Sequence, residues 1–224
     1  MCSLYSFRKS ADETRALLKY LQHPLFPPRE HVHPTSPIPI VRAGLGGARE
    51  FALVRWGFVP SWAKTVSPQP LLNARSETVH EKATFKNAIR RRRCLIPADG
   101  FYEWQDVGEK RKQAWFIHCP DDALFAFGGI WEHWSGADGS ELETAAILTS
   151  APNALIANIH DRSPVVIQPQ DYDRWLSSDE QVQDLLVPPP DEFWVMGKVV
   201  SPRARNPQTQ IVAAPRPDSQ LDLL

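Results

Sequence analysis

Apolar and polar positions alternate over short distances along this chain, and that pattern predicts strands more than long helices. Runs of four to eight residues with such alternation, bounded by turn residues, are typical of β-strands. Continuous or alternating apolar segments of this kind occupy residues 38–42, 50–58, 94–104, 115–119, 124–134 and 144–149. The proline-punctuated residues 23–40 are expected to form a loop.

Helical spacing is weaker and occurs in short pieces. Residues 12–22 open with acidic side chains and place Leu17, Leu18 and Leu21 on one face, which predicts a helix. Further helices are expected over residues 75–87, 153–159 and 171–177. Strands mixed with short helices, without regular βαβ alternation, predict an α+β or mainly β fold.

The composition is that of a soluble globular protein. The chain has 224 residues, 42% hydrophobic and 23% charged, a length that allows one domain or a tight pair. Twenty-one prolines against eleven glycines favour rigid loops. No internal repeat is visible, and the polar, proline-rich residues after Ser201 are expected to wrap the surface and then fray.

The net charge, the cysteines and the hydropathy limit which binding partners and which cellular compartment are expected. A net charge of −1 means that nucleic-acid binding would have to rest on a local patch. The three cysteines are odd in number and lack CxxC spacing, as in a reduced cytosolic protein without a structural zinc site. No signal peptide and no apolar run of transmembrane length are visible, so a cytoplasmic protein without membrane contact is expected.

Cys2 is the residue with the most unusual chemical potential. If Met1 is removed, Cys2 presents an amine (pKa ~7.7–8) and a thiol (pKa ~8.5) on neighbouring carbons. The amine can attack an aldehyde to form a Schiff base, and the thiol can then close a five-membered thiazolidine ring. An internal cysteine cannot do this, although a Met-Cys start by itself also occurs by chance.

Two polar residues, Asn73 and Glu103, each admit a structural and a functional interpretation. Asn73 stands just before the helix expected over 75–87, where it could be a helix cap or a rigid amide beside a reacting centre. Glu103 follows the Asp99-Gly100 turn and shares a strand face with Phe101. It lies either at an exposed edge or in a partly apolar pocket, which would raise its pKa and make it a general acid.

His160 and the arginines are ambiguous in the same way. His160 is followed by Asp161, but neighbours in a strand point apart, so the pair alone is no catalytic dyad. The arginine run at 90–93 is either a solvated face or a phosphate-contacting patch. With Arg75, Arg162 and Trp62 it could line a groove for single-stranded nucleic acid.

Taken in order, the separated motifs resemble one family, the SOS-response-associated peptidase-like (SRAP) proteins, which shield abasic sites in single-stranded DNA. The resemblance covers Met1 to about Ser201, so it implies a SRAP domain over residues 1–201 and a tail over residues 202–224. It also implies an α+β fold with a mainly antiparallel, barrel-like core and short helices. The matching segments are MCS, RWGFVPSWAK, LLNARSETV, RRRRCLIPADGFYEW, FAFGGIWEHW, ILTSAPNALIANIHDRSPVVI and DYDRWL.

The resemblance assigns roles to the candidate residues. Cys2, freed of Met1, would crosslink to the C1′ aldehyde of an abasic site, with Asn73 positioning the amine and sugar. Glu103 would shuttle protons, and His160 would assist opening of the sugar ring. Arg75 and Arg162 match the family's phosphate contacts, and Trp62 lies in the loop that wedges beside the DNA. Neither metal nor cofactor is implied, and a monomer, nucleoid-associated when bound to DNA, is expected.

The chain also departs from the family pattern. The family usually begins Met-Cys-Gly-Arg, whereas this chain has Ser3 and Leu4; His31 and Ser163 replace a usual asparagine and methionine. These changes bear on DNA affinity and groove shape. Three hypotheses remain open: abasic-site capture with a possible lyase side activity, a cysteine peptidase acting on its own leader, and a non-covalent reader of single-stranded or modified DNA.

Overall fold

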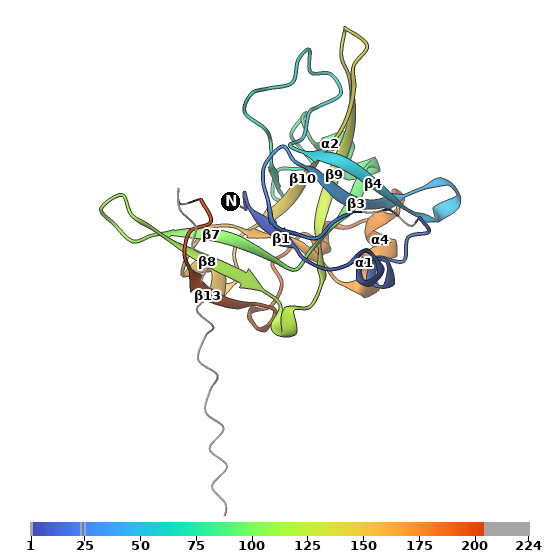
Figure 1. Ribbon diagram of the computed structural model, residues 1–224. Coiled ribbons are helices and arrows are strands. Elements are labelled where there is room, and N and C mark those ends of the chain that lie inside the picture. Colours follow the sequence, from blue (N-terminus) through green and yellow to red (C-terminus); the bar gives the residue numbers. More distant parts are fainter. Residues whose placement is uncertain (1, 23, 25, 204–224) are drawn as a thin grey trace, which may run out of the picture.

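The strands of the protein form two sheets, seen in a computed structural model that describes residues 2–22, 24 and 26–203 (Figure 1). The first sheet closes on itself. Each of its five main strands pairs with two neighbours, and the last closes the ring through a parallel pairing with β4, whereas the other four pairings are antiparallel. This barrel consists of β3 (Pro37–Ala43), β4 (Arg49–Trp56), β6 (Arg93–Ala98), β9 (Phe125–Ser135) and β10 (Glu141–Ser150).

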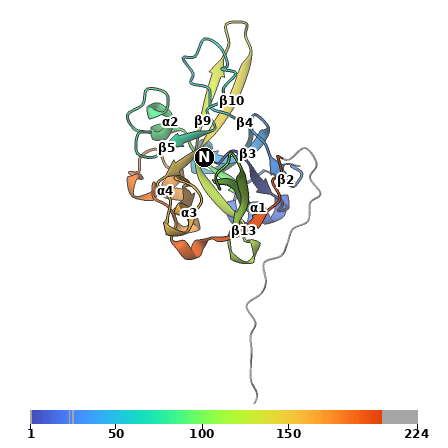
Figure 2. The same cartoon turned by 90° about the vertical axis from the view of Figure 1, so that its left-hand side faces the viewer.

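Three short strands extend the barrel at its edges. β5 runs parallel to β10, β11 pairs with β10, and β12 pairs with β9. Their bounds are β5 (Asn73–Arg75), β11 (Ser163–Pro164) and β12 (Val166–Ile167). Figure 2 shows the β9–β10 hairpin and the loop between β4 and β5 projecting side by side from the same end of the molecule. A hydrogen bond from Trp134 Nε1 to the Ala63 carbonyl (2.7 Å) joins these two projections.

The second sheet is antiparallel throughout and packs against the barrel. Its order is β13–β8–β7–β1–β2. The apolar side chains between the two sheets form a continuous core that includes Tyr5, Phe101 and Phe127. The strands are β1 (Tyr5–Phe7), β2 (Arg29–Val32), β7 (Gly100–Asp106), β8 (Lys112–His118) and β13 (Val195–Val199).

The helices are short and cover the outside of the barrel. α1 starts with a capping box between Ser10 and Glu13 and ends at Lys19, whose left-handed φ of 53° stops it. The helix predicted over 12–22 is therefore too long, and Leu21 is exposed. The helices are α1 (Ala11–Leu18), α2 (Lys86–Arg91), α3 (Ala154–Ala157) and α4 (Tyr172–Leu176), and single 3₁₀ turns lie at Leu45–Gly47, Pro120–Asp122, Pro169–Asp171, Gln183–Leu185 and Asp191–Phe193.

The α+β class and barrel-like core are confirmed, with three local corrections. The helix predicted over 75–87 is wrong, because Asn73–Arg75 joins β10 as a strand and only Lys86–Arg91 is helical. The run 94–104 is two strands, since the chain leaves the barrel at Ala98 and enters the second sheet at Gly100. The loop expected over 23–40 contains β2 and the start of β3.

Two further expectations concern the ends and the membrane. The predicted tail over 202–224 lies outside the described residues except for Pro202 and Arg203. In the described part of the chain, no helix is long and apolar enough to cross a membrane.

Candidate functional site

Cys2 lies in the interior, three residues before the start of β1. Its side chain is 1% exposed, and its carbonyl accepts a 2.8 Å hydrogen bond from Asn73 Nδ2. The partner amide is placed by β5: strand pairing with β10 buries Ala74 and turns Asn73 and Arg75 to the opposite side. Asn73 is thus a strand residue bonded to Cys2, and the helix-cap interpretation is wrong.

Glu103, on β7, is the buried carboxyl of the site. Its 2% exposure excludes the edge position and fits the apolar pocket that its alternation with Phe101 allowed. Burial raises the pKa of Glu103 to about 7. The pKa of the Cys2 thiol is raised far above its usual value, first by burial and then by the negative charge of Glu103. The carboxyl and the thiol therefore interact electrostatically. Because its pKa is raised, the thiol is protonated at neutral pH.

His160 connects to Glu103 from the other side. Its Nε2 lies 3.6 Å from Glu103 Oε2, while the Arg162 backbone N–H donates to Nδ1 (3.0 Å). As an acceptor of this bond, Nδ1 leaves the proton of the neutral ring on Nε2, facing Glu103; the Asp161 carboxylate, also 3.0 Å from Nδ1, favours the opposite tautomer. Burial lowers the pKa of His160, which favours the neutral ring. Asp161 Oδ1 lies 3.0 Å from Nδ1, so the expectation that His160 and Asp161 point apart is wrong; they lie in the irregular segment between α3 and β11, not in a strand.

The candidate DNA-contacting residues occupy different environments. Arg162 is mostly buried, and its guanidinium bonds both oxygens of Glu77 (2.7 and 2.8 Å) and the Thr149 carbonyl. Arg75 is exposed on β5, and among the described residues its guanidinium has no hydrogen bond or ion pair. Trp62 is 66% exposed in the β4–β5 loop, whose base is closed by pairing of Phe58 with Leu71.

The arginine run is mainly structural. Arg93 is 5% exposed and donates to the carbonyls of Ile89 and Trp175, whereas Arg92 pairs with the mostly buried Glu132 at 2.6 Å. Only residues 90 and 91 face solvent. Arg92 and Arg93 therefore belong neither to a solvated face nor to a phosphate-binding patch. Their guanidinium groups bond groups of the protein itself: the Glu132 carboxylate for Arg92, and backbone carbonyls for Arg93.

Sequence reasoning missed the residues that support the site from a distance. Glu77 holds Arg162, and Arg203 donates to Ser3 Oγ at 2.6 Å although 200 positions separate the two residues. No motif or spacing pointed to either contact. Of the departures, Ser3 takes part in this contact, whereas Leu4 and Ser163 are fully buried, and His31 packs against the Tyr102 ring.

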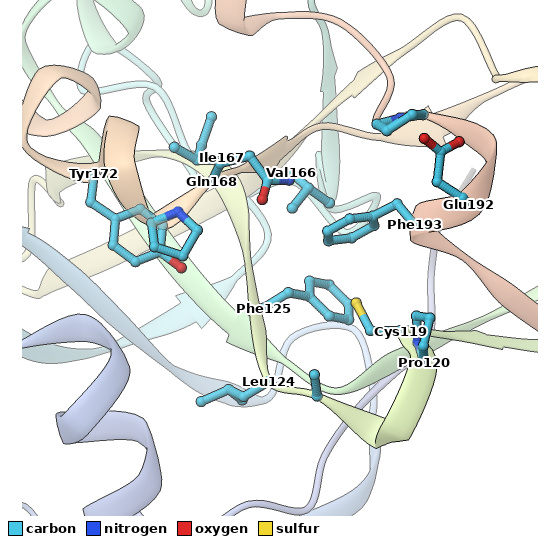
Figure 3. Close-up of a pocket in the computed structure, with 13 residues that line it drawn as sticks. Cys119, Pro120, Leu124, Phe125, Val166, Ile167, Gln168, Tyr172, Glu192 and Phe193 are labelled. Atoms are coloured by element: carbon cyan, nitrogen blue, oxygen red, sulfur yellow. The ribbon is translucent and has the colours of Figure 1, made fainter.

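A mainly apolar cavity lies elsewhere in the molecule. It measures about 400 Å³ and is lined by residues such as Cys119, Phe125, Val166 and Phe193, with Tyr172 at one side (Figure 3). None of the candidate site residues lines it. Within the described ranges, no group of three or more His, Cys, Asp or Glu side chains is placed to hold a metal ion.

The fold is that of an α+β protein in which an antiparallel sheet flanks a closed barrel. Its second residue, Cys2, is buried beside the Glu103 carboxyl and the Asn73 amide. The chain matches the SOS response associated peptidase (SRAP) family over residues 1–204 and belongs to that family.

Similar proteins and structures agree with this assignment. The chain is 36% identical over 172 residues to abasic site processing protein YoqW of Bacillus subtilis. The aligned residues cover 73% of this chain and 77% of that protein. It is 31% identical over 158 residues to abasic site processing protein HMCES of Rattus norvegicus, covering 57% of this chain and 45% of the rat protein. A crystal structure of a protein from Bordetella bronchiseptica has 27% identity and a TM-score of 0.78, covering 89% of this chain and all of that one.

Proposed function

We propose that this protein captures abasic sites in single-stranded DNA by forming a thiazolidine crosslink through Cys2 after Met1 is removed. One observation carries the proposal: Asn73 bonds the Cys2 carbonyl, and the charge of Glu103, itself beside His160, acts on the Cys2 thiol. The names of the relatives, which are abasic site processing proteins, support the choice of substrate.

The proposed reaction balances as a condensation. The free amine of Cys2 attacks the C1′ aldehyde of the ring-opened sugar to give a carbinolamine, which loses water to form a Schiff base. The Cys2 sulfur then adds to the imine carbon, and the thiol proton is transferred so that the ring nitrogen ends as a secondary amine. One aldehyde and one aminothiol give one thiazolidine and one water, without an oxidant or a leaving group other than water.

Each neighbouring residue has a step that suits its environment. With a pKa of about 7, Glu103 is present in both protonation states near neutral pH, so it can donate a proton to the departing hydroxyl and accept one from the thiol. In the tautomer that carries its proton on Nε2, neutral His160 can donate to the sugar oxygen as the ring opens. Asn73 holds the Cys2 backbone so that the amine has a fixed direction.

We expect the DNA strand to run past Arg75, Arg162 and Trp62. Arg75 lies on the Asn73 side of β5 and pairs with Thr149, whose carbonyl Arg162 bonds. Arg75 offers an exposed guanidinium, and Trp62 offers an exposed ring for stacking with a base. Arg162 already has Glu77 as a bidentate partner, so we expect its contribution to be the fixing of Thr149 and His160 as much as a phosphate contact.

A lasting cysteine peptidase is less well supported by this geometry. Such an enzyme needs a thiolate, whereas burial keeps the Cys2 thiol protonated, and the large apolar cavity does not include Cys2. Removal of Met1 by the protein itself remains compatible with the proposal as a single maturation event.

The test uses protein with a verified free Cys2 and a single-stranded oligonucleotide containing one abasic site. A denaturing gel and intact-mass analysis should show a heat-stable adduct at the mass of protein plus DNA minus one water. The adduct should disappear in Cys2→Ala and when Met1 is retained. Cys2→Ser keeps the amine but lacks the thiol, so it should give a reversible or strand-cleaving Schiff base. If the wild-type protein binds the DNA without any adduct, the covalent mechanism is wrong and a reader function replaces it.

A further inference from the structure

We propose that Arg203 and Ser3 form an additional phosphate-binding position beside Cys2, which holds the backbone of the DNA strand next to the captured sugar. The inference rests on the proposed function for its ligand. It assigns a role to Arg203, which lies at the end of the described chain and outside every motif discussed above.

The geometry of Arg203 is that of a fixed guanidinium. Its Nη2 donates to Ser3 Oγ at 2.6 Å and to the Ser3 carbonyl at 3.3 Å, and its Cζ lies 3.9 Å from the centre of the Trp104 ring. Trp104 is itself held by a 3.1 Å bond from its Nε1 to Ser201 Oγ. A ring face and two oxygens thus fix the plane of a side chain that is usually mobile.

This fixed cation is still open to a ligand. Arg203 is exposed, and of its guanidinium nitrogens only Nη2 makes a hydrogen bond within the described residues. Both of its contacts at Ser3 are neutral oxygens, so neither of them neutralises its charge. A guanidinium presents five N–H donors in a planar fork, which matches the oxygens of a phosphate. The donors not used on Ser3 remain available for such a group.

The position places that phosphate beside the reaction. Ser3, whose hydroxyl and carbonyl both hold Arg203, follows Cys2 directly. Trp104 follows Glu103 on β7 and therefore projects from the opposite face of that strand. The positive charge of Arg203 also lowers the pKa of both Cys2 and Glu103, against the larger effect of burial, which agrees with this proximity. A phosphate bound there would lie next to the sugar that reacts with Cys2.

Ser3 supplies a contact that a residue without a hydroxyl could not make. Leu4, by contrast, is fully buried, so its side chain cannot reach a ligand at the surface. The cationic group that would contact the DNA beside Ser3 is therefore the guanidinium of Arg203, a residue 200 positions later in the sequence.

The experiment separates this inference from the proposed function by measuring binding without chemistry. In a Cys2→Ala background, the affinity for a fluorescent single-stranded oligonucleotide with one abasic site is measured as a function of salt. Arg203→Ala and Arg203→Gln should each weaken binding about tenfold at low salt and reduce the slope of log K against log salt by about 0.7, the value for one phosphate contact on a single strand. Arg203→Lys, which keeps the charge, should retain most of the slope.

Two further variants make the result specific. Ser3→Ala keeps the charge but removes one anchor, so it should weaken binding less than Arg203→Ala and leave the salt slope unchanged. Arg15→Ala removes an arginine from α1, on the other side of the molecule from the β7–β8 hairpin (Figure 1), and should change neither quantity. Melting temperatures would check that all variants are folded.

The outcomes are decisive in both directions. Unchanged affinity and slope in Arg203→Ala and Arg203→Gln would overturn the inference, because Arg203 would then only tie down the chain at Ser3. If the wild-type protein forms no adduct but Arg203 variants still lose a phosphate contact, the proposed function fails and the phosphate position stands.

Discussion

At the scale of single residues, burial of the Glu103 carboxyl determines the pH range in which the proposed chemistry can operate. Its pKa of about 7 means that the protonated acid declines above pH 7, whereas the free amine of Cys2 increases up to its own pKa of ~8. The rate of crosslinking should therefore pass through a maximum between these values.

Replacement of Glu103 by glutamine tests this explanation. Glu103→Gln cannot donate or accept the proton, so we expect the rate at pH 7 to fall ~10²- to 10⁴-fold. The decline on the alkaline side of the maximum should also vanish, leaving only the rise due to the amine. Single-turnover adduct formation followed from pH 5.5 to 9 would measure both effects. A variant with a reduced rate and an unchanged bell-shaped profile would show that Glu103 is not the group that titrates.

The same carboxyl should weaken the fold at neutral and alkaline pH. Because its pKa in the folded protein, about 7, is above the ordinary value of 4.5, the folded state binds more protons between these values. The free energy of unfolding therefore decreases as the pH rises from 4.5 to 7. Glu103→Gln removes this effect and should be more stable than wild type by at most about 3 kcal/mol above pH 7. Urea unfolding at pH 4.5 and pH 8 would measure it, and an equal difference at both values would contradict the explanation.

Asn73 is expected to act on the reaction more than on stability. Asn73→Ala loses the 2.8 Å bond to the Cys2 carbonyl, so the rate of crosslinking should fall ~10- to 100-fold while the free energy of unfolding drops by about 1 kcal/mol. Asn87→Ala, which removes an exposed amide on α2, is the matched control and should affect neither. A loss of rate fully explained by a loss of folded protein would exclude the positioning role.

At the scale of elements, the entry of the chain into β7 depends on the lack of a side chain at Gly100. A Cβ atom there would overlap the Phe116 ring on the neighbouring strand β8. Gly100→Ala should destabilise the protein by about 1–3 kcal/mol through overpacking. Phe116→Leu should offset part of this cost in the double variant, which a thermodynamic cycle would measure. Purely additive effects would show that the two positions do not conflict.

The elements also show which parts of the structure the sequence could predict. Alternation located most barrel strands, and the ordered motifs indicated Cys2, Asn73, Glu103 and His160, which the structure brings together. The Asn73–Arg75 strand was missed because three residues are too few for a periodic pattern, and it forms only through pairing with β10. Contacts such as Glu77–Arg162 or Ser3–Arg203 join distant segments, and neither composition nor spacing records them.

At the scale of the whole molecule, Asp99 joins the barrel to the second sheet. It is fully buried between β6 and β7, accepts from Ser6 Oγ (2.5 Å) and from the backbone N–H and Nε of Arg8, and its own N–H donates to the Ser6 carbonyl. Through β1, which contains Ser6 and follows Cys2, this junction fixes the start of the chain relative to the barrel.

Removal of that carboxylate should weaken both sheets together and misplace Cys2. Asp99→Ala leaves Ser6 and Arg8 without their buried acceptor, so we expect a loss of about 3 kcal/mol in the free energy of unfolding. Adduct formation should also slow under conditions where the variant is fully folded. Asp122→Ala is the control, because Asp122 meets the same Arg8 at 3.5 Å on the surface, where an ion pair contributes about 0–1 kcal/mol. Amide hydrogen exchange should become faster in both the barrel and the second sheet of Asp99→Ala, and should be unchanged in Asp122→Ala. If exchange becomes faster in the second sheet only, the barrel positions Cys2 without the contribution of Asp99.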